Sequence, residues 1–244
     1  QSAKSLAIGA VRDLFYTFLT ELTKQFVAPY KFQPFHKAVR APFDYQEFGK
    51  NFFRPLIDLE GSQLLGEKQL LEILLLLEKK ENVILFANHQ TEPDPQLMQI
   101  LLGKKYQSLA DAIIFVAGER VLTAPEAIPF CLGCHLFCIY SKKYIHCPPE
   151  KKYAKQLHNQ KTLKNMLAQL KEGGRCIYVA PSGGRDRRNK QGEMILAPFD
   201  PKNIATFQLL AKKSLRPCHF YPLSLHTYDL LPPPEQIHKT IGEK

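Results

Sequence analysis

A histidine and an aspartate stand five residues apart in the segment Asn88–Pro95, directly after the short apolar stretch Val83–Phe86. Ligand sites in open α/β sheets lie at the carboxyl ends of strands, so His89 is predicted to lie at such a site. Asp94 can turn back to hold one imidazole nitrogen, which leaves the other nitrogen to take a proton from a hydroxyl group. The spacing is also consistent with a plain helix N-cap at Asp94, before Pro95, and with an ordinary loop histidine.

A second cluster, Pro181–Arg188, follows the apolar stretch Cys176–Ala180. Its adjacent glycines allow the backbone to approach a ligand closely. Arg185 and Arg187 offer planar guanidinium groups that pair with phosphate or carboxylate oxygens. Because this cluster also follows a predicted strand, we expect it beside the histidine, in a basic pocket for an anionic substrate with a reacting hydroxyl group.

Lys142 and Lys143 follow a third predicted strand, Phe137–Tyr140, and add positive charge to the same edge of the sheet. The sequence lacks the motifs of dinucleotide, nucleoside triphosphate and zinc-protease sites, and it lacks the nucleophile elbow of serine hydrolases. The stretch Cys131–His135 contains the C-x-x-C-H pattern of haem attachment, but no second Cys/His pair follows at the spacing of a zinc site. We therefore expect no cofactor and no metal.

Most of the excess positive charge lies in one segment. The formal net charge of the chain is +10, and residues 142–190 contain 13 basic against three acidic side chains, which equals that excess. Such a segment attracts phosphates, an acidic protein or an anionic membrane surface, although the lysines of residues 151–164 also fit a solvated helix face. It contains no recognised nucleic-acid motif, so nucleic acid is not expected as a partner.

Hydrophobic periodicity divides the chain into an N-terminal helical part and a later part in which strands and helices alternate. Apolar residues recur at three- and four-residue steps over residues 6–26, 48–57 and 70–77, which is typical of amphipathic helices. From residue 83, predicted strands alternate with longer helices, the longest of which ends at Gly173-Gly174. The strands are Val83–Phe86, Ile113–Ala117, Phe137–Tyr140, Cys176–Ala180 and Phe220–Leu225, and the helices cover residues 95–102, 149–172 and 201–214.

This alternation predicts an α/β fold with a largely parallel sheet covered by helices. We expect a small N-terminal helical domain over residues 1–80 and an α/β domain over residues 81–244. No apolar run reaches the roughly 18 to 20 residues that span a bilayer, so a soluble protein is expected. Six cysteines, several within apolar runs, favour free thiols and a reducing compartment. Because the sequence begins with Gln1 and not with Met, the question of whether a targeting segment has been removed stays open.

The motifs, taken in order, resemble those of glycerolipid acyltransferases. Asn88–Pro95 is similar to their N-H-x-x-x-x-D motif, and Pro181–Arg187 is similar to their P-x-G-x-R block. Further segments resemble the soluble, plastid-type glycerol-3-phosphate acyltransferases, namely Phe115–Arg120, Tyr140–Lys143, Ala197–Asp200 and Pro232–Pro234. The resemblance covers about residues 45–244.

The resemblance implies transfer of a fatty acyl group from an acyl carrier protein or coenzyme A thioester to the sn-1 hydroxyl of glycerol 3-phosphate. The product would be 1-acylglycerol 3-phosphate (lysophosphatidate), in the first step of glycerolipid synthesis. His89 and Asp94 map onto the family's catalytic pair. Its phosphate-binding residues map onto Lys143, Arg185 and Arg187. A histidine usually follows that lysine in the family, where this chain has Tyr144, so Tyr144 is expected at the phosphate site with its role left open.

Two other functions remain open from the sequence. The acceptor can be another phosphorylated alcohol such as lysophosphatidate, which requires a long apolar groove beside the site. The chain can instead be a non-catalytic binder of anionic lipid, for which the basic segment alone suffices. The expected partners are acyl carrier protein or acyl-CoA, glycerol 3-phosphate and a transient anionic membrane surface, in a bacterial cytoplasm or a plastid stroma.

Overall fold

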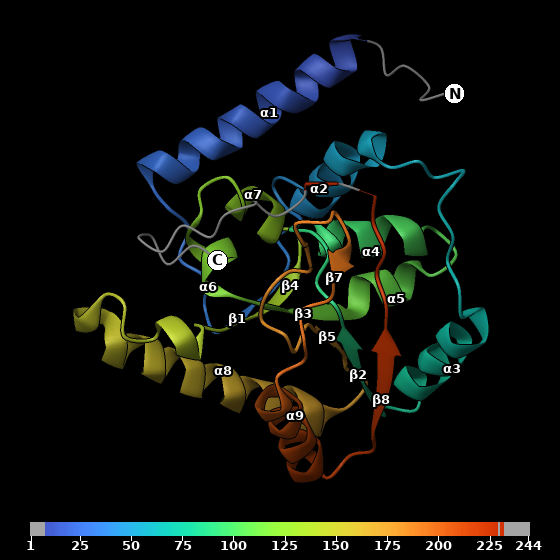
Figure 1. Ribbon diagram of the computed structural model, residues 1–244, viewed down its shortest axis with the longest axis vertical. Coiled ribbons are helices and arrows are strands. Elements are labelled where there is room, and N and C mark those ends of the chain that lie inside the picture. Colours follow the sequence, from blue (N-terminus) through green and yellow to red (C-terminus); the bar gives the residue numbers. More distant parts are fainter. Residues whose placement is uncertain (1–7, 229, 232–244) are drawn as a thin grey trace.

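The computed structural model describes residues 8–228 and 230–231, with a six-stranded sheet at its centre (Figure 1). The strand order is β1-β4-β3-β5-β2-β8. The strands are β1 (Phe35–His36), β2 (Asn82–Ala87), β3 (Ile113–Ala117), β4 (His135–Cys138), β5 (Cys176–Val179) and β8 (Cys218–Leu223). Strand β1 pairs antiparallel with β4, and every other pairing in this sheet is parallel. The predicted α/β class is therefore confirmed.

Helices precede the sheet in the chain and then alternate with its strands. They are α1 (Ile8–Val27), α2 (Tyr45–Phe53), α3 (Glu67–Glu78), α4 (Asp94–Leu102), α5 (Gln107–Ala112), α6 (Glu119–Thr123), α7 (Ile128–Cys131), α8 (Lys152–Glu172) and α9 (Pro201–Ser214). The predicted helices are all present, whereas α5, α6 and α7 are too short to produce a periodic pattern. Among the described helices, none is long and apolar enough to cross a membrane.

Alternate side chains of the central strands enter two separate cores, as the period of two in a strand requires. Val83 and Leu85 belong to one buried cluster, which includes residues from α3, α4 and α5. Ile84 and Ile177 belong to the other cluster, which includes residues from α8 and α9. Helices therefore cover both faces, and the carboxyl ends of the parallel strands meet along one edge.

Two strands end two residues earlier than predicted, and in both cases an asparagine side chain replaces the next strand partner. Beyond β4, the Asn159 amide accepts from the Tyr140 N–H at 2.7 Å and donates to the Tyr140 carbonyl at 2.8 Å. Beyond β8, the Asn88 amide makes the same pair of bonds with the backbone of Leu225, at 2.8 and 2.9 Å. A side chain that satisfies both backbone groups ends the ladder without leaving them unpaired.

The N-terminal segment packs directly on the sheet. Strand β1, too short to give a sequence pattern, pairs Phe35 with Phe137 of β4. Helix α2 packs against α4 and α7, and the ring of Phe18 in α1 stacks on that of Phe130 in α7, with centroids 5.4 Å apart. The boundary at residue 80 stays a prediction, and extensive contacts cross it.

Helix α8 ends as predicted at the glycine pair. Gly173 has φ +79° and Gly174 has φ +71°, a backbone region that side chains other than glycine rarely adopt. A Cβ at Gly173 would lie 2.2 Å from the carbonyl oxygen of Lys80. Glycine is therefore needed there both for conformation and for space.

We expect Gly173→Ala to lower the free energy of unfolding by at least about 2 kcal/mol, because it adds backbone strain and a clash with Lys80. The measurement is urea unfolding followed by circular dichroism. Gly9→Ala is the matched control, because a Cβ there meets no atom within 4 Å and alanine favours the helix. A Gly173→Ala protein as stable as the wild type would contradict this account.

Candidate functional site

A cavity of about 630 Å³ opens at the carboxyl ends of β2, β3 and β5. Polar residues of its wall come from the segments that follow these strands, namely His89, Glu92, Asp94, Arg120 and Arg185. Aromatic residues from the helices line another part of the wall, namely Phe18, Phe52, Phe53 and Phe130. The cavity therefore joins a charged edge of the sheet to an apolar chamber. Such a cavity suits a ligand that has both a charged group and an apolar part.

His89 and Asp94 are in direct contact on this wall. The imidazole Nδ1 lies 2.7 Å from Asp94 Oδ2. The carboxylate side chain is only 2% exposed, whereas that of His89 is 27% exposed. Because the buried carboxylate accepts from Nδ1–H, it favours the tautomer in which Nε2 is free to accept a proton.

The Asp94 carboxylate is fixed by the turn that precedes it. Its Oδ1 accepts from the Thr91 N–H at 3.0 Å, and its Oδ2 accepts from the Gln90 N–H at 3.2 Å. The Tyr178 hydroxyl lies 3.4 Å from the same Oδ2. Burial, and then the negative charge of Asp94, hold the pKa of Tyr178 well above its ordinary value, so this phenol stays a donor.

The prediction that Asp94 is the N-cap of its helix is wrong by one position. Helix α4 begins at Asp94 itself, and Pro93 is the N-cap residue. The reason is that the carboxylate turns back to the backbone of Gln90 and Thr91 and to the imidazole, instead of capping the turn ahead of it.

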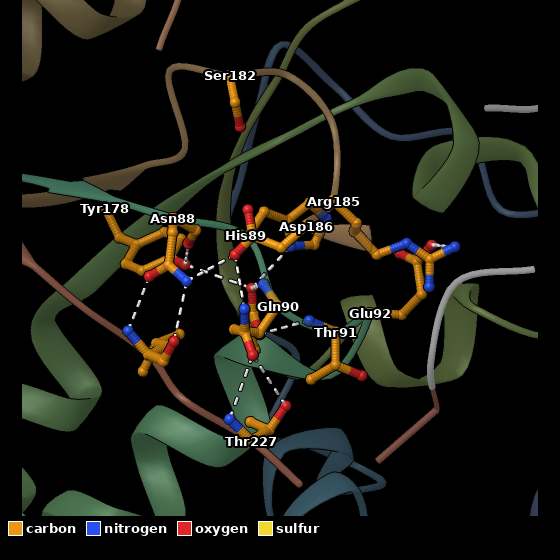
Figure 2. Close-up of polar contacts among 12 residues, drawn as sticks. Asn88, His89, Gln90, Thr91, Glu92, Tyr178, Ser182, Arg185, Asp186 and Thr227 are labelled. Carbon is orange, nitrogen blue, oxygen red and sulfur yellow. Dashed lines mark hydrogen bonds and ion pairs between the residues drawn. The ribbon is translucent and has the colours of Figure 1, made fainter. Parts of the chain in front are cut away.

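A buried aspartate connects this turn to the arginine cluster (Figure 2). Asp186 Oδ2 accepts from the Asn88 side-chain amide at 2.8 Å and from the Gln90 side-chain amide at 2.6 Å. Its Oδ1 accepts from the Ala197 N–H at 2.8 Å, and its own N–H donates to the His89 carbonyl at 2.8 Å. One residue therefore ties the loops after β2 and β5 together around the histidine.

Arg185 extends into the cavity beside Glu92. Its side chain is 5% exposed, and its Nη2 lies 3.3 Å from Glu92 Oε1. Arg120, which is 40% exposed, reaches the same oxygen at 3.5 Å. Burial lowers the pKa of Arg185, an effect that Glu92 opposes and that Arg120 and Arg187 reinforce. An arginine keeps its charge against such shifts, so the cavity has a positive wall next to His89.

Two further predicted residues, Arg187 and Tyr144, lie outside the described cavity lining. Arg187 lies in the short strand β6 (Arg187–Arg188), which pairs with β7 (Met194–Ile195), close enough to Arg185 to affect its pKa. Lys143 and Tyr144 lie in the single turn η2 (Lys142–Tyr144) after β4. Of the six predicted site residues, the described cavity wall brings together His89, Asp94 and Arg185. Pro232–Pro234, part of the family resemblance, lies outside the described residues.

The basic segment is divided between surface and interior. Lys151, Lys152, Lys161 and Lys164 are exposed on or just before α8. Lys155 is instead buried, and its ammonium group pairs with Glu119 at 2.5 Å. The predicted solvated face therefore keeps four of the five lysines, and the fifth anchors α8 to the residue next to Arg120.

The sequence analysis missed several residues of this wall. Glu119 and Arg120 stand two and three residues after the predicted strand Ile113–Ala117, at the same kind of strand end as His89, and this position is the signal that could have identified them. Asp186 stands inside the recognised arginine cluster, yet its network joins residues about 96 to 98 positions away, which no local pattern indicates. The aromatic residues of α1 and α2 were seen only as helix periodicity.

The cysteines of the C-x-x-C-H pattern have a packing role. Cys131 and Cys134 are free thiols in the cavity lining, and burial raises the pKa of Cys134 to about 12. His135 Nδ1 accepts from the Ala38 N–H at 3.2 Å, and burial lowers the pKa of this histidine. Across residues 8–228 and 230–231, no group of three His, Cys, Asp or Glu side chains is placed to hold a metal.

This geometry allows two kinds of chemistry at one place. The His89–Asp94 pair can remove a proton from a hydroxyl group, and the arginine wall can hold an anionic part of the same molecule. The aromatic chamber can hold an apolar chain.

Comparisons with known proteins agree with this chemistry. The family model described as "Acyltransferase" matches residues 69–225. A chloroplastic glycerol-3-phosphate acyltransferase of Arabidopsis thaliana is 43% identical over 217 residues, which cover 88% of this chain and 47% of that protein. A chloroplastic glycerol-3-phosphate acyltransferase of Cucurbita moschata is 44% identical over 218 residues, covering 88% of this chain and 48% of that protein. A chloroplastic glycerol-3-phosphate acyltransferase of Spinacia oleracea is 41% identical over 217 residues, which cover 88% of this chain and 46% of that protein.

The chain spans about half the length of the curated relatives it matches. The match to the family model covers the strand ends, the histidine turn and the arginine cluster that build the cavity. The resemblance in the motifs is confirmed, and the chain belongs to the acyltransferase family.

Proposed function

We propose that this chain transfers a fatty acyl group from a thioester to the sn-1 hydroxyl of glycerol 3-phosphate. The observation that carries this proposal is the single cavity in which the His89–Asp94 pair, Arg185 and an aromatic chamber meet. The names of the curated relatives specify the same acceptor. The product is 1-acylglycerol 3-phosphate.

In the proposed reaction, His89 Nε2 takes the proton of the sn-1 hydroxyl while its oxygen attacks the thioester carbonyl. Asp94 holds the imidazole and stabilises its positive charge as the proton arrives. The new C–O bond forms, the C–S bond breaks, and the imidazolium returns its proton to the departing thiolate. The reaction needs no covalent enzyme intermediate.

Arg185 holds the phosphate group of the acceptor, and we propose that Arg187, Lys143 and Tyr144 also take part in binding it. Fixing the phosphate places the hydroxyl against the histidine, so that part of the barrier is removed by orientation. The acyl chain of the donor occupies the chamber formed by the aromatic rings, where burial of its methylene groups supplies binding free energy.

For the donor, we propose an acyl carrier protein, which is strongly acidic, in preference to coenzyme A. The exposed lysines of α8 attract it over a distance comparable with the Debye length. The same lysines allow transient contact with an anionic membrane surface, where the product is delivered. We propose a plastid as the compartment, because the curated relatives are chloroplastic.

The test of the reaction is a steady-state assay with palmitoyl-acyl carrier protein and glycerol 3-phosphate, in which release of the thiol is followed. Thiol release that requires glycerol 3-phosphate supports the proposal. Palmitoyl-CoA as donor and lysophosphatidate as acceptor are run alongside. Transfer to lysophosphatidate alone, or to neither acceptor from either donor, would reject it.

His89→Ala is expected to lower kcat by at least about 100-fold, because the general base is removed. Asp94→Asn is expected to act in the same direction, since an amide no longer stabilises the charged imidazole. The matched control is His219→Ala, at the amino end of β8 on the opposite edge of the sheet, where the histidine pairs with Glu81. Near-normal turnover of the His89→Ala protein would eliminate this mechanism.

Arg185→Gln is expected to raise the KM for glycerol 3-phosphate about tenfold or more, because a charged partner of the phosphate is lost. The KM for the donor should stay unchanged. Arg188→Gln is the control, because this nearby exposed arginine donates to the Gly192 carbonyl on the hairpin. If the two variants gave the same KM for glycerol 3-phosphate, the phosphate would have to bind elsewhere.

The double variant Lys161→Gln/Lys164→Gln is expected to raise the KM for palmitoyl-acyl carrier protein at low ionic strength and to lose this effect at about 0.5 M salt. The control is Lys212→Gln/Lys213→Gln, which removes the same charge from the exposed end of α9. Equal KM values for the two double variants at low salt would argue against docking on α8.

A further inference from the structure

The Glu92 carboxylate lies where an anionic group entering the cavity would meet the arginine wall. Figure 2 shows Glu92 and Arg185 pointing toward one another. Oε1 of Glu92 lies 3.3 Å from Arg185 Nη2 and 3.5 Å from Arg120 Nη1, so one oxygen bridges two arginines. We propose that Glu92 is an internal competitor of the substrate phosphate for Arg120 and Arg185, and thereby sets the affinity of the cavity for phosphate. This inference rests on the proposed function for the identity of the acceptor.

The buried arginine is incompletely satisfied by this carboxylate. Arg185 Nη2 is fully shielded from solvent and makes no hydrogen bond to any of the residues that the structure describes. Its contact with Glu92 is an ion pair without hydrogen-bond geometry. A buried donor without an acceptor costs free energy, so a better acceptor is favoured at this position. A phosphate has three terminal oxygens, which allows it to accept from both arginines at once.

The charge on the wall requires Glu92 to leave when phosphate binds. With Glu92 in place, Arg120, Arg185 and Glu92 together carry a net charge of +1, and once Glu92 has turned away the two arginines offer +2 to a phosphate dianion. A phosphate held by Arg185 would also lie within a few ångströms of Glu92 Oε1, and two anions at that distance repel one another. The arginines are therefore fully available to phosphate only after the carboxylate has turned away.

Glu92 is free to make this movement, and the buried carboxylates near it are not. Its side chain is 29% exposed, and within the described residues its ion pairs are those with Arg120 and Arg185. Asp94 and Asp186 are both about 1% exposed and each accepts several hydrogen bonds. Arg120 is 40% exposed and can follow the ligand, so the exchange needs no rearrangement of the core.

Direct binding measurements with Glu92→Gln test this inference. We expect the dissociation constants of glycerol 3-phosphate and of inorganic phosphate, measured by titration calorimetry, to fall about tenfold, because the competing charge is gone. The KM for glycerol 3-phosphate should fall in parallel, while the KM for the donor stays unchanged. A glutamate with only a structural role would affect stability and kcat without tightening phosphate binding.

The matched control is Glu126→Gln. Glu126 lines the same cavity, but its carboxylate makes no ion pair with any described residue, so phosphate affinity should stay at the wild-type value. If Glu92→Gln does not fold, Glu92→Asp is used, since its shorter side chain weakens both arginine contacts and should also tighten phosphate binding. Unchanged or weaker phosphate binding in the folded Glu92 variant would overturn the inference.

The two proposals fail in different ways. If the wild type transfers acyl groups to glycerol 3-phosphate but Glu92→Gln binds phosphate no more tightly, then only the role of Glu92 is rejected. If the wild type transfers nothing to glycerol 3-phosphate while Glu92→Gln binds inorganic phosphate more tightly, the proposed reaction is rejected and the role of Glu92 stands.

Discussion

The site depends on one buried carboxylate, that of Asp186. A charge that is 1% exposed is costly unless hydrogen bonds satisfy it, and here two side-chain amides and a backbone N–H do so. These donors come from the histidine turn and from the segment before α9, and the Asp186 N–H returns a bond to the His89 carbonyl. The histidine turn and the arginine cluster are therefore held in register because separating them would leave a buried charge unpaired.

Buried polar groups are also satisfied by hydrogen bonds where the strands end. Asn88 satisfies the backbone of Leu225 beyond β8 and donates to Asp186. The Asn88 side chain therefore ends the pairing of β2 with β8 and also belongs to the polar network around Asp186. Tyr178, one residue before the end of β5, adds a hydroxyl that contacts Asp94. Positions at the carboxyl edge of the sheet thus serve structure and site together.

Much of this arrangement was predictable from local sequence. The strand Ile113–Ala117 and the helix over residues 201–214 are at their predicted bounds, because strong periodicity and caps act over a few residues. His89 and Asp94 meet for the same reason, since only one turn separates them. The Asp186 network, the pairing of β1 with β4 and the closure of the chamber by α1 join distant parts of the chain, and no short pattern encodes such contacts.

The aromatic chamber has a consequence for how this protein can change. Its rings come from α1, α2 and α7, whereas the His89–Asp94 pair and the arginines follow the strands β2, β3 and β5. The shape of the chamber and the polar groups of the strand edge are therefore encoded by different residues, on helices and after strands respectively. Substitutions in the helices can resize the chamber without disturbing the Asp186 network, so the size of the apolar group that fits can diverge between relatives while the polar edge of the cavity stays the same.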